Sequence, residues 1–140
     1  MQDRRELLTV GMTALAAALL ARQEVQAAPA VKAVAEKDAP KINLDGWRMS
    51  ASEITYPPGE SSGRHRHPGF VIGYVLQGRY RFAVNDHAPT VLSAGEMFFE
   101  SFETPGEIHA VSGNASSTEP AKILAIVFTK KGDPVTVPVA

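Results

Sequence analysis

Three of the four histidines in this 140-residue chain lie where they could bind one metal ion. His65 and His67 are separated by a single residue, and on an extended chain residues i and i+2 point to the same side. His109 comes later, at the start of another strand-like run. Imidazole suits Zn, Cu, Fe and Ni, and three such ligands leave positions open for water or substrate.

The spacing therefore predicts a divalent metal site formed by His65, His67 and His109. The candidate ions are Fe, Mn, Zn and Ni, and the spacing does not choose among them. The alternative is that these are surface histidines in turn-rich segments, or buried histidines satisfied by hydrogen bonds. The fourth histidine, His87, follows the turn residues Asn85 and Asp86 and is left out of the site.

The residues around these histidines resemble the two sequence motifs of the cupin superfamily. The first motif, G-x5-HxH-x3,4-E-x6-G, is matched by Gly59, His65, His67 and Gly78. The second, G-x5-PxG-x2-H-x3-N, is resembled by Gly95, Gly106, His109 and Asn114. The resemblance covers roughly residues 47–137. It implies a small single-domain cupin with the cupin-type double-stranded β-helix, a jelly-roll barrel, and a metal bound by the three histidines.

The glutamate of the first motif has no counterpart here. Its two possible positions hold Val71 and Ile72, neither of which can bind a metal, so a three-histidine site is the default expectation. Glu100 and Glu103 lie within nine residues of His109, and either could supply a fourth ligand. A solvated loop carboxylate is nevertheless the favoured interpretation of both. Val71 and Gly73 are expected to leave apolar room beside the site.

Three neutral imidazoles leave the charge of a divalent ion uncompensated, so the site should favour a small, anionic, bidentate molecule. An enolate, an α-hydroxy carboxylate or a phenolate would suit it, with the metal acting as a Lewis acid or activating dioxygen. The first hypothesis is a mononuclear metal-dependent oxygenase of such a substrate. The alternatives are a non-catalytic, extracytoplasmic small-ligand-binding cupin and a structural barrel with a vestigial site. The pattern identifies no catalytic residue and leaves turnover open.

Short apolar runs separated by turn signals follow Trp47 and predict an all-β fold. Strands are expected at residues 47–56, 70–77, 79–84, 90–92, 97–102, 108–112, 121–129 and 134–137, with residues 65–67 extended.

The strand at residues 70–77 is apolar on both faces. Phe70, Ile72, Tyr74 and Leu76 alternate with a second apolar set, residues 71, 73 and 75. A strand apolar on both faces is usually buried on both, but only one face can look into a small barrel. A second subunit would cover the other face most simply, so a homodimer is expected. The alternative is an N-terminal segment folded over that face.

Residues 1–30 resemble a twin-arginine-like export signal. Arg4 and Arg5 precede an uncharged run that is shorter than the roughly 20 residues of a spanning helix. Small residues then offer cleavage after Ala27 or Ala30. The protein is therefore expected to be periplasmic or otherwise exported, without a stable membrane anchor once the signal is removed. A flexible leader is expected at residues 31–45 and the cupin domain at residues 46–138.

The composition of the chain excludes several kinds of partner and site. The net charge is −1 and no basic run is present, so no nucleic-acid partner is expected. The chain contains no cysteine, which excludes disulfides, thiolate metal sites and cysteine nucleophiles. The expected partner is a small-molecule ligand or substrate.

Overall fold

The computed structural model describes residues 28–140, and β-strands are the regular structure found there. In chain order they are β1 (Trp47–Tyr56), β2 (Ser61–Ser62), β3 (His65–Arg66), β4 (Gly69–Gln77), β5 (Arg79–Val84), β6 (Thr90–Ser93), β7 (Met97–Glu100), β8 (Ile108–Asn114), β9 (Ala121–Lys130) and β10 (Val137–Pro138). Residues 28–140 contain no helix long and apolar enough to cross a membrane.

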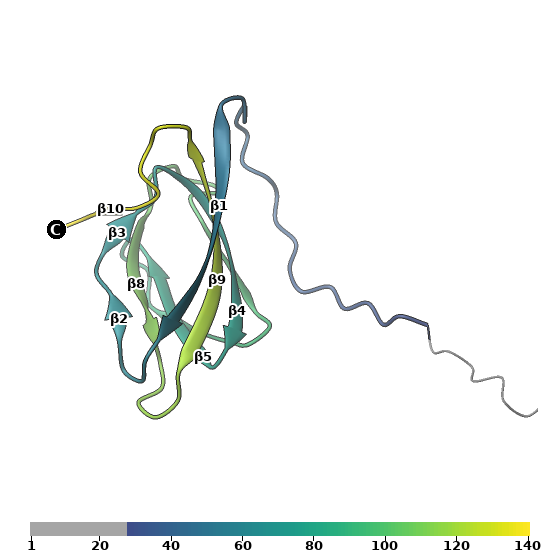
Figure 1. The fold of residues 1–140 in the computed structure, drawn as a ribbon, viewed down its shortest axis with the longest axis vertical. Coiled ribbons are helices and arrows are strands. Elements are labelled where there is room, and N and C mark those ends of the chain that lie inside the picture. The colour runs from purple at the N-terminus through teal and green to yellow at the C-terminus, as the bar shows by residue number, and fades with distance from the viewer. Residues whose placement is uncertain (1–27) are drawn as a thin grey trace, which may run out of the picture. The chain divides into compact units, whose positions relative to one another are not determined.

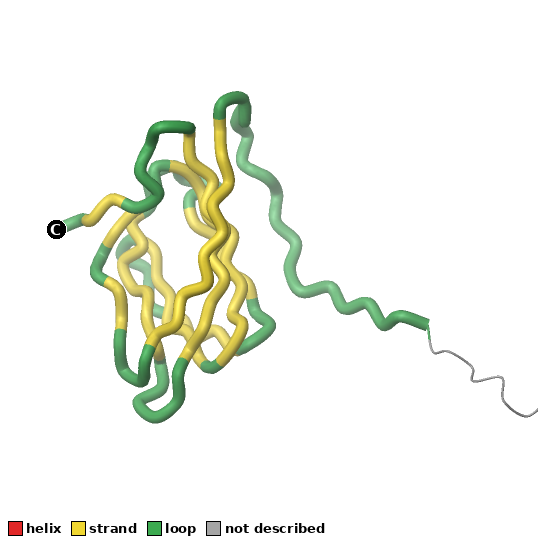
Figure 2. The backbone as a smooth tube through the Cα atoms, in the orientation of Figure 1, coloured by secondary structure: helices red, strands yellow, loops and turns green. Residues whose placement is uncertain are grey.

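The strands form two antiparallel sheets that face each other (Figure 1). One sheet has the order β1-β9-β4-β7. The other has the order β10-β3-β8-β5-β6, and β2 also pairs with β8. Several strands that are consecutive in the chain, such as β4 and β5 or β7 and β8, lie in different sheets and are joined by loops at the two ends, whereas β5 and β6 pair in the same sheet (Figure 2). The prediction of an all-β jelly roll is confirmed.

The expected strand positions are close to the observed ones except at the C-terminal strand, which was expected at residues 134–137 and is found at Val137–Pro138. β7 ends at Glu100 instead of continuing to Phe102 because Ser101 has a positive φ of 59°, which turns the chain out of the sheet. β8 runs on to Asn114, whose side-chain amide donates hydrogen bonds to the carbonyls of Tyr56, Pro57 and Glu119. The two-residue strand β2 was missed, since two serines carry no apolar signal.

The core lies between the sheets, on the face of β4 that carries residues 71, 73 and 75. Val71 and Val75 are fully buried there, as is Tyr80 on β5. The room expected beside Gly73 is taken by an aromatic ring. A Cβ atom on Gly73 would lie only 1.9 Å from Cζ of Phe98, so glycine is required for the ring to pack at this point.

The outer face of β4 carries an aromatic cluster. Phe70 stacks on Phe128 with ring centroids 4.6 Å apart, and Trp47 and Phe102 pack at its edges. Residues 35–44 line a hollow of about 360 Å³ together with this cluster. Residues 35–44 lie beside this face but are exposed apart from Pro40. Both the cover by an N-terminal segment and the homodimer remain predictions.

The expected leader at residues 31–45 contains neither helix nor strand. The predicted export signal, residues 1–30, lies outside the described residues apart from its last three.

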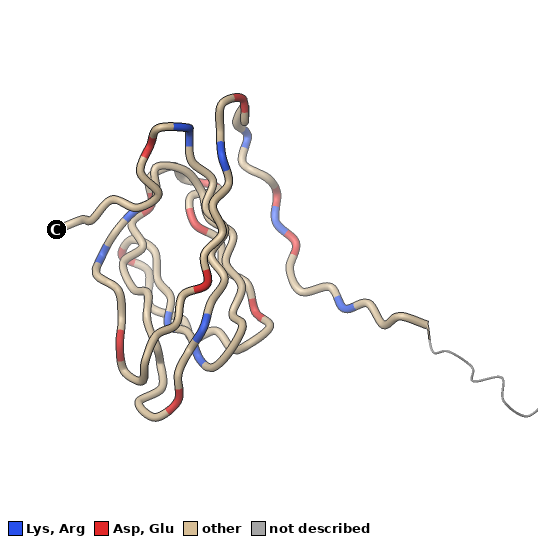
Figure 3. The backbone as a smooth tube through the Cα atoms, in the orientation of Figure 1, with Lys and Arg blue, Asp and Glu red and all other residues tan. Residues whose placement is uncertain are grey.

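Acidic and basic residues are interspersed along the described chain (Figure 3). One such pair, Glu53 and Lys122, joins β1 to β9 across 2.8 Å.

Candidate metal centre

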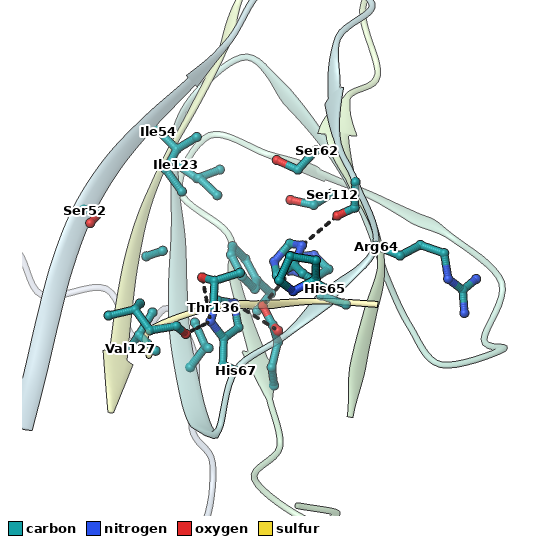
Figure 4. A pocket seen from close by; sticks show the side chains of 18 of the residues that line it. Ser52, Ile54, Ser62, Arg64, His65, His67, Ser112, Ile123, Val127 and Thr136 are labelled. Atoms are coloured by element: carbon teal, nitrogen blue, oxygen red, sulfur yellow. Dashed lines mark hydrogen bonds and ion pairs between the residues drawn. The ribbon is translucent and has the colours of Figure 1, made fainter. Parts of the chain in front are cut away.

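The three histidines predicted as ligands converge on one point between the sheets. His65 on β3 lies directly opposite His109 on β8 in the strand pairing, and His67 follows β3 on the same side as His65. One ring nitrogen from each histidine lies within 4.8 Å of the other two. His67 and His109 are buried and His65 is half-buried. Figure 4 shows His65 and His67 directed into the same space.

An irregularity in β8 turns His109 toward that space. In the pairing of β5 with β8, Ala83 lies opposite Val111 but Val84 lies opposite His109, which leaves Ala110 as an extra residue. Residues three apart on a regular strand point to opposite faces, yet His109 and Ser112 are both buried. The bulge changes the alternation so that both side chains point inward, a role bulges often have near functional sites.

Backbone carbonyls hold the first two imidazoles. The Nδ1 atom of His65 lies 2.8 Å from the carbonyl oxygen of Gly63, and Nδ1 of His67 lies 2.7 Å from that of Val135. A carbonyl can only accept, so each Nδ1 carries the hydrogen and each Nε2 keeps a free lone pair. Burial lowers the pKa of His65, which favours the neutral, ligating form.

The third imidazole is held by a hydroxyl. Nε2 of His109 lies 3.1 Å from the hydroxyl of Tyr80, which is also 2.7 Å from Oγ of Ser112. Ser112 is in turn bonded to the hydroxyl of Tyr56 at 2.7 Å, and Tyr56 to Ser62 at 3.0 Å. Burial raises the pKa of Tyr80 far above its ordinary value, so this phenol stays neutral. A row of hydroxyl groups therefore leads from His109 to Ser62.

A carboxylate lies beside the histidines. Glu100 is 2% exposed, with Oε1 at 3.0 Å from Nδ1 of His109 and Oε2 at 3.9 Å from Nε2 of His67. The interpretation of Glu100 as a solvated loop residue was wrong, because it closes β7 with its side chain inward. The signal was its spacing of two from the inward-facing Phe98. Glu103 is exposed and pairs with Lys37, as a solvated carboxylate would.

The histidines and Glu100 line a cavity of about 390 Å³, within the size range of small-molecule sites. Serine, threonine and tyrosine hydroxyls give it a few polar points. The guanidinium of Arg64 is directed away from the histidines (Figure 4). The walls are mainly apolar and are formed by Ile54, Val71, Phe98, Ile123, Ala125, Val127 and Val135.

The residues of the site fit a divalent cation. Among the described residues, three buried side-chain atoms have no hydrogen-bond partner, and two of them are here: Oε2 of Glu100 and Nδ1 of His109. Nδ1 and the nearer carboxylate oxygen are 3.0 Å apart without the alignment of a hydrogen bond. Buried polar atoms are rarely left unpaired, and a metal ion would use both lone pairs.

The chain belongs to the cupin family: a cupin-domain family model matches residues 52–127. No curated protein matches the chain. Among solved structures, a DMSP lyase from Ruegeria pomeroyi is 20% identical with a TM-score of 0.53, covering 65% of this chain and 43% of that protein. This likeness shows the fold alone.

Two further solved structures are somewhat more similar in sequence. An oxalate oxidase in complex with the substrate analogue glycolate is 25% identical with a TM-score of 0.54, covering 69% of this chain and 48% of that protein. A protein from Thermotoga maritima described as a predicted oxalate decarboxylase is 29% identical with a TM-score of 0.50, covering 61% and 69%. The chain thus spans less than half of the lyase and of the oxidase.

Proposed function

We propose that this chain binds one divalent metal ion through His65, His67 and His109 and uses it to bind a small anionic molecule. The observation that carries the proposal is the convergence of three imidazoles, within 4.8 Å, on a buried site that contains unpartnered polar atoms. Hydrogen bonds that His65 and His67 donate to the carbonyls of Gly63 and Val135 already hold both rings in the tautomer that ligation needs.

The bound molecule is proposed to be a carboxylate, or a related enolate or phenolate, with an apolar part. Similarity to an oxalate oxidase and to a predicted oxalate decarboxylase supports the carboxylate. The cavity of about 390 Å³ is large for an acid of a few atoms, and its walls are mainly apolar. The anionic group would lie at the histidines and the apolar part against Ile54, Ile123 and Val127.

As an enzyme, the protein would be a mononuclear metal-dependent oxygenase of this anionic substrate. When bound, the ion would supply Lewis acidity and, if it is redox-active, access to one-electron chemistry. The chain's own residues keep the imidazoles neutral, orient His109 through Tyr80, and exclude water with the apolar walls. The hydroxyls of Tyr80, Ser112 and Tyr56 form a chain of hydrogen bonds between His109 and Ser62.

A non-catalytic ligand-binding cupin is the second candidate, and the composition of the cavity favours it. Apart from the histidines and Glu100, the polar side chains directed into the described cavity are hydroxyls, and Arg64 is directed away. None of them is an obvious general acid or base near neutral pH. On either function, the protein is proposed to act outside the cytoplasm after removal of its signal.

The decisive experiment measures metal content and turnover together. Protein purified from its native compartment should contain one divalent ion per chain by elemental analysis. His65→Ala/His67→Ala should lose it, because His109 alone is a poor chelate, whereas His87→Ala should keep it. Full metal occupancy in the double variant would refute the site. Oxygen consumption on a panel of diketones and phenolic acids then separates the oxygenase from the binding protein.

A further inference from the structure

One position of β4 where the first cupin motif can have a glutamate is apolar in this chain. A glutamate lies directly opposite it on the neighbouring strand β7. Val71, which occupies one of the two glutamate positions of the first cupin motif, pairs with Glu100 of β7. Side chains opposite each other in an antiparallel pair lie on the same face, with Cβ atoms about 4.5–5.5 Å apart. Both residues line the cavity. A carboxylate on β7 can therefore reach the region that a carboxylate on β4 would occupy.

We propose that Glu100 is a fourth metal ligand, joining His65, His67 and His109, so that the carboxylate of this site comes from β7 and not from β4. The inference rests on the proposed function, since it concerns the same ion. It replaces the three-histidine default with a mixed nitrogen and oxygen ligand set. It also makes Glu100, which no sequence motif marks, a residue that determines which metal is bound.

The distances agree with this role. Oε1 of Glu100 is 3.0 Å from Nδ1 of His109 but is not aligned for a hydrogen bond with it. Two ligand atoms about 2.1 Å from one ion, at a right angle to each other, are about 3.0 Å apart. The second oxygen, Oε2, lies 3.9 Å from Nε2 of His67 and has no partner of its own.

Burial points in the same direction. The side chain of Glu100 is 2% exposed, and the ion-pairing groups near it among the described residues are His67 and His109. Acidic side chains are rarely buried so fully unless they are paired or bind a metal. Both histidines must be neutral to bind a metal, so they cannot then balance the charge of the carboxylate. A divalent ion can.

The backbone beside Glu100 is fixed in an unusual conformation. Ser101 has a φ of 59°, in the left-handed region that favours glycine. Reciprocal hydrogen bonds hold it there: its N–H donates to Oε2 of Glu107 at 2.6 Å, and its Oγ accepts from the N–H of Glu107 at 3.2 Å. This clamp ends β7 immediately after Glu100, whose carboxylate lines the cavity. Such outliers occur preferentially at ligand sites.

A carboxylate should change which ion the site prefers. Carboxylate oxygen suits Mn(II), whereas imidazole alone favours ions nearer to Cu(II) in the affinity order. The negative charge of Glu100 would also lower the net charge of a bound divalent site from +2 to +1, which still attracts a small anion. The proposal therefore predicts that Glu100 strengthens Mn(II) binding more than Zn(II) binding.

The test compares Glu100→Gln with a matched control, Glu103→Gln. Both changes remove one carboxylate charge without changing side-chain length. Glu103 is exposed, and it pairs with Lys37 and not with a histidine. Metal-free proteins are titrated with Mn(II) and Zn(II) against a competing chelator, and the electron paramagnetic resonance spectrum of bound Mn(II) is recorded. A third protein, Val71→Glu/Glu100→Val, exchanges the two side chains across the strand pair.

Glu100→Gln should weaken Mn(II) binding by about 100-fold or more, since groups that only orient ligands already contribute about 10–100-fold. Its Mn(II) spectrum should change, and Glu103→Gln should match the wild type in both measurements. Wild-type affinity and spectrum in Glu100→Gln would overturn the inference while leaving the three-histidine function intact. Absence of metal binding by the wild type would instead refute the function itself, and the inference with it.

The exchange variant keeps the test decisive if Glu100→Gln does not fold. It retains both side-chain volumes and the carboxylate, displaced by one strand. It is compared with Glu100→Val, which has no carboxylate at either position. Mn(II) affinity that is at least about tenfold higher in the exchange variant than in Glu100→Val, the lower end of the effect of an orienting group, would support ligation from this strand pair. Equal affinity in the two proteins would overturn it.

Discussion

Replacing Tyr80 with Phe should weaken metal binding although Tyr80 is not a ligand. The ring is fully buried and packs on Phe98 and Phe82, with centroids 5.1 and 6.3 Å away. Phenylalanine keeps this packing and removes only the hydroxyl. That hydroxyl contacts Nε2 of His109 at 3.1 Å and Oγ of Ser112 at 2.7 Å. Without it, the imidazole of His109 loses the group that fixes its rotation.

Two magnitudes follow from these contacts. Partners that orient a ligating histidine typically contribute 10–100-fold to metal affinity, so Tyr80→Phe should weaken binding by about that factor. The change also leaves the buried Ser112 and His109 with one hydrogen-bond partner fewer. An unpaired buried polar group costs about 1–3 kcal/mol, and the free energy of unfolding of the metal-free protein should fall by about this amount.

Tyr56→Phe is the matched control. Its hydroxyl bonds to Ser112 at 2.7 Å and to Ser62 at 3.0 Å, but His109 is not among its partners. It should therefore lower the free energy of unfolding in urea by a similar amount while keeping metal affinity near the wild-type value. Equal metal affinity in Tyr80→Phe and wild type, or an equal loss in both variants, would refute the argument that Tyr80 positions His109.

Three further predictions concern pH, export and assembly. Because burial lowers the pKa of His65 below about 6.5, the unfolded chain takes up this proton first, so metal-free stability should fall as pH drops below about 6.5. In metal-free His65→Gln, the midpoint of urea unfolding should fall less over this pH range than in the wild type. Identical pH profiles of the two proteins would contradict this prediction. Changing Arg4 and Arg5 to Lys should keep the protein out of the extracytoplasmic fraction, and undiminished export would point to a general secretory signal instead. The mature chain should sediment as a dimer. A monomer mass at high concentration would contradict this prediction and favour residues 35–44 as the cover of the outer face of β4.

Much of the fold followed from local patterns in the sequence. Alternation and turn residues placed the longer strands, and Val71 lies beside the site as expected. Short strands without apolar residues, such as β2, gave no such pattern. The end of β7 could not be predicted either, because it depends on the left-handed backbone of Ser101, which serine rarely adopts.

The convergence of the histidines was predictable, but the rest of the site was not. His65 and His67 share a face by simple alternation, and the motif resemblance added His109. The inward direction of His109 depends on the extra residue in β8, and the residue types at that point do not indicate a bulge. The carbonyl that holds His67 belongs to Val135, which follows it by 68 residues. Contacts at that separation require the tertiary structure.

The proposal for Glu100 illustrates that a missing motif residue does not by itself mean a missing ligand. A motif records which position of the chain supplies a group, whereas a metal responds only to where the group is in space. The pairing of Val71 with Glu100 makes two positions 29 residues apart nearly equivalent with respect to the cavity. One buried glutamate at either position could serve the same ion, and having one at both would add a second buried negative charge. The apolar residue at position 71 is therefore the expected counterpart of a glutamate at position 100.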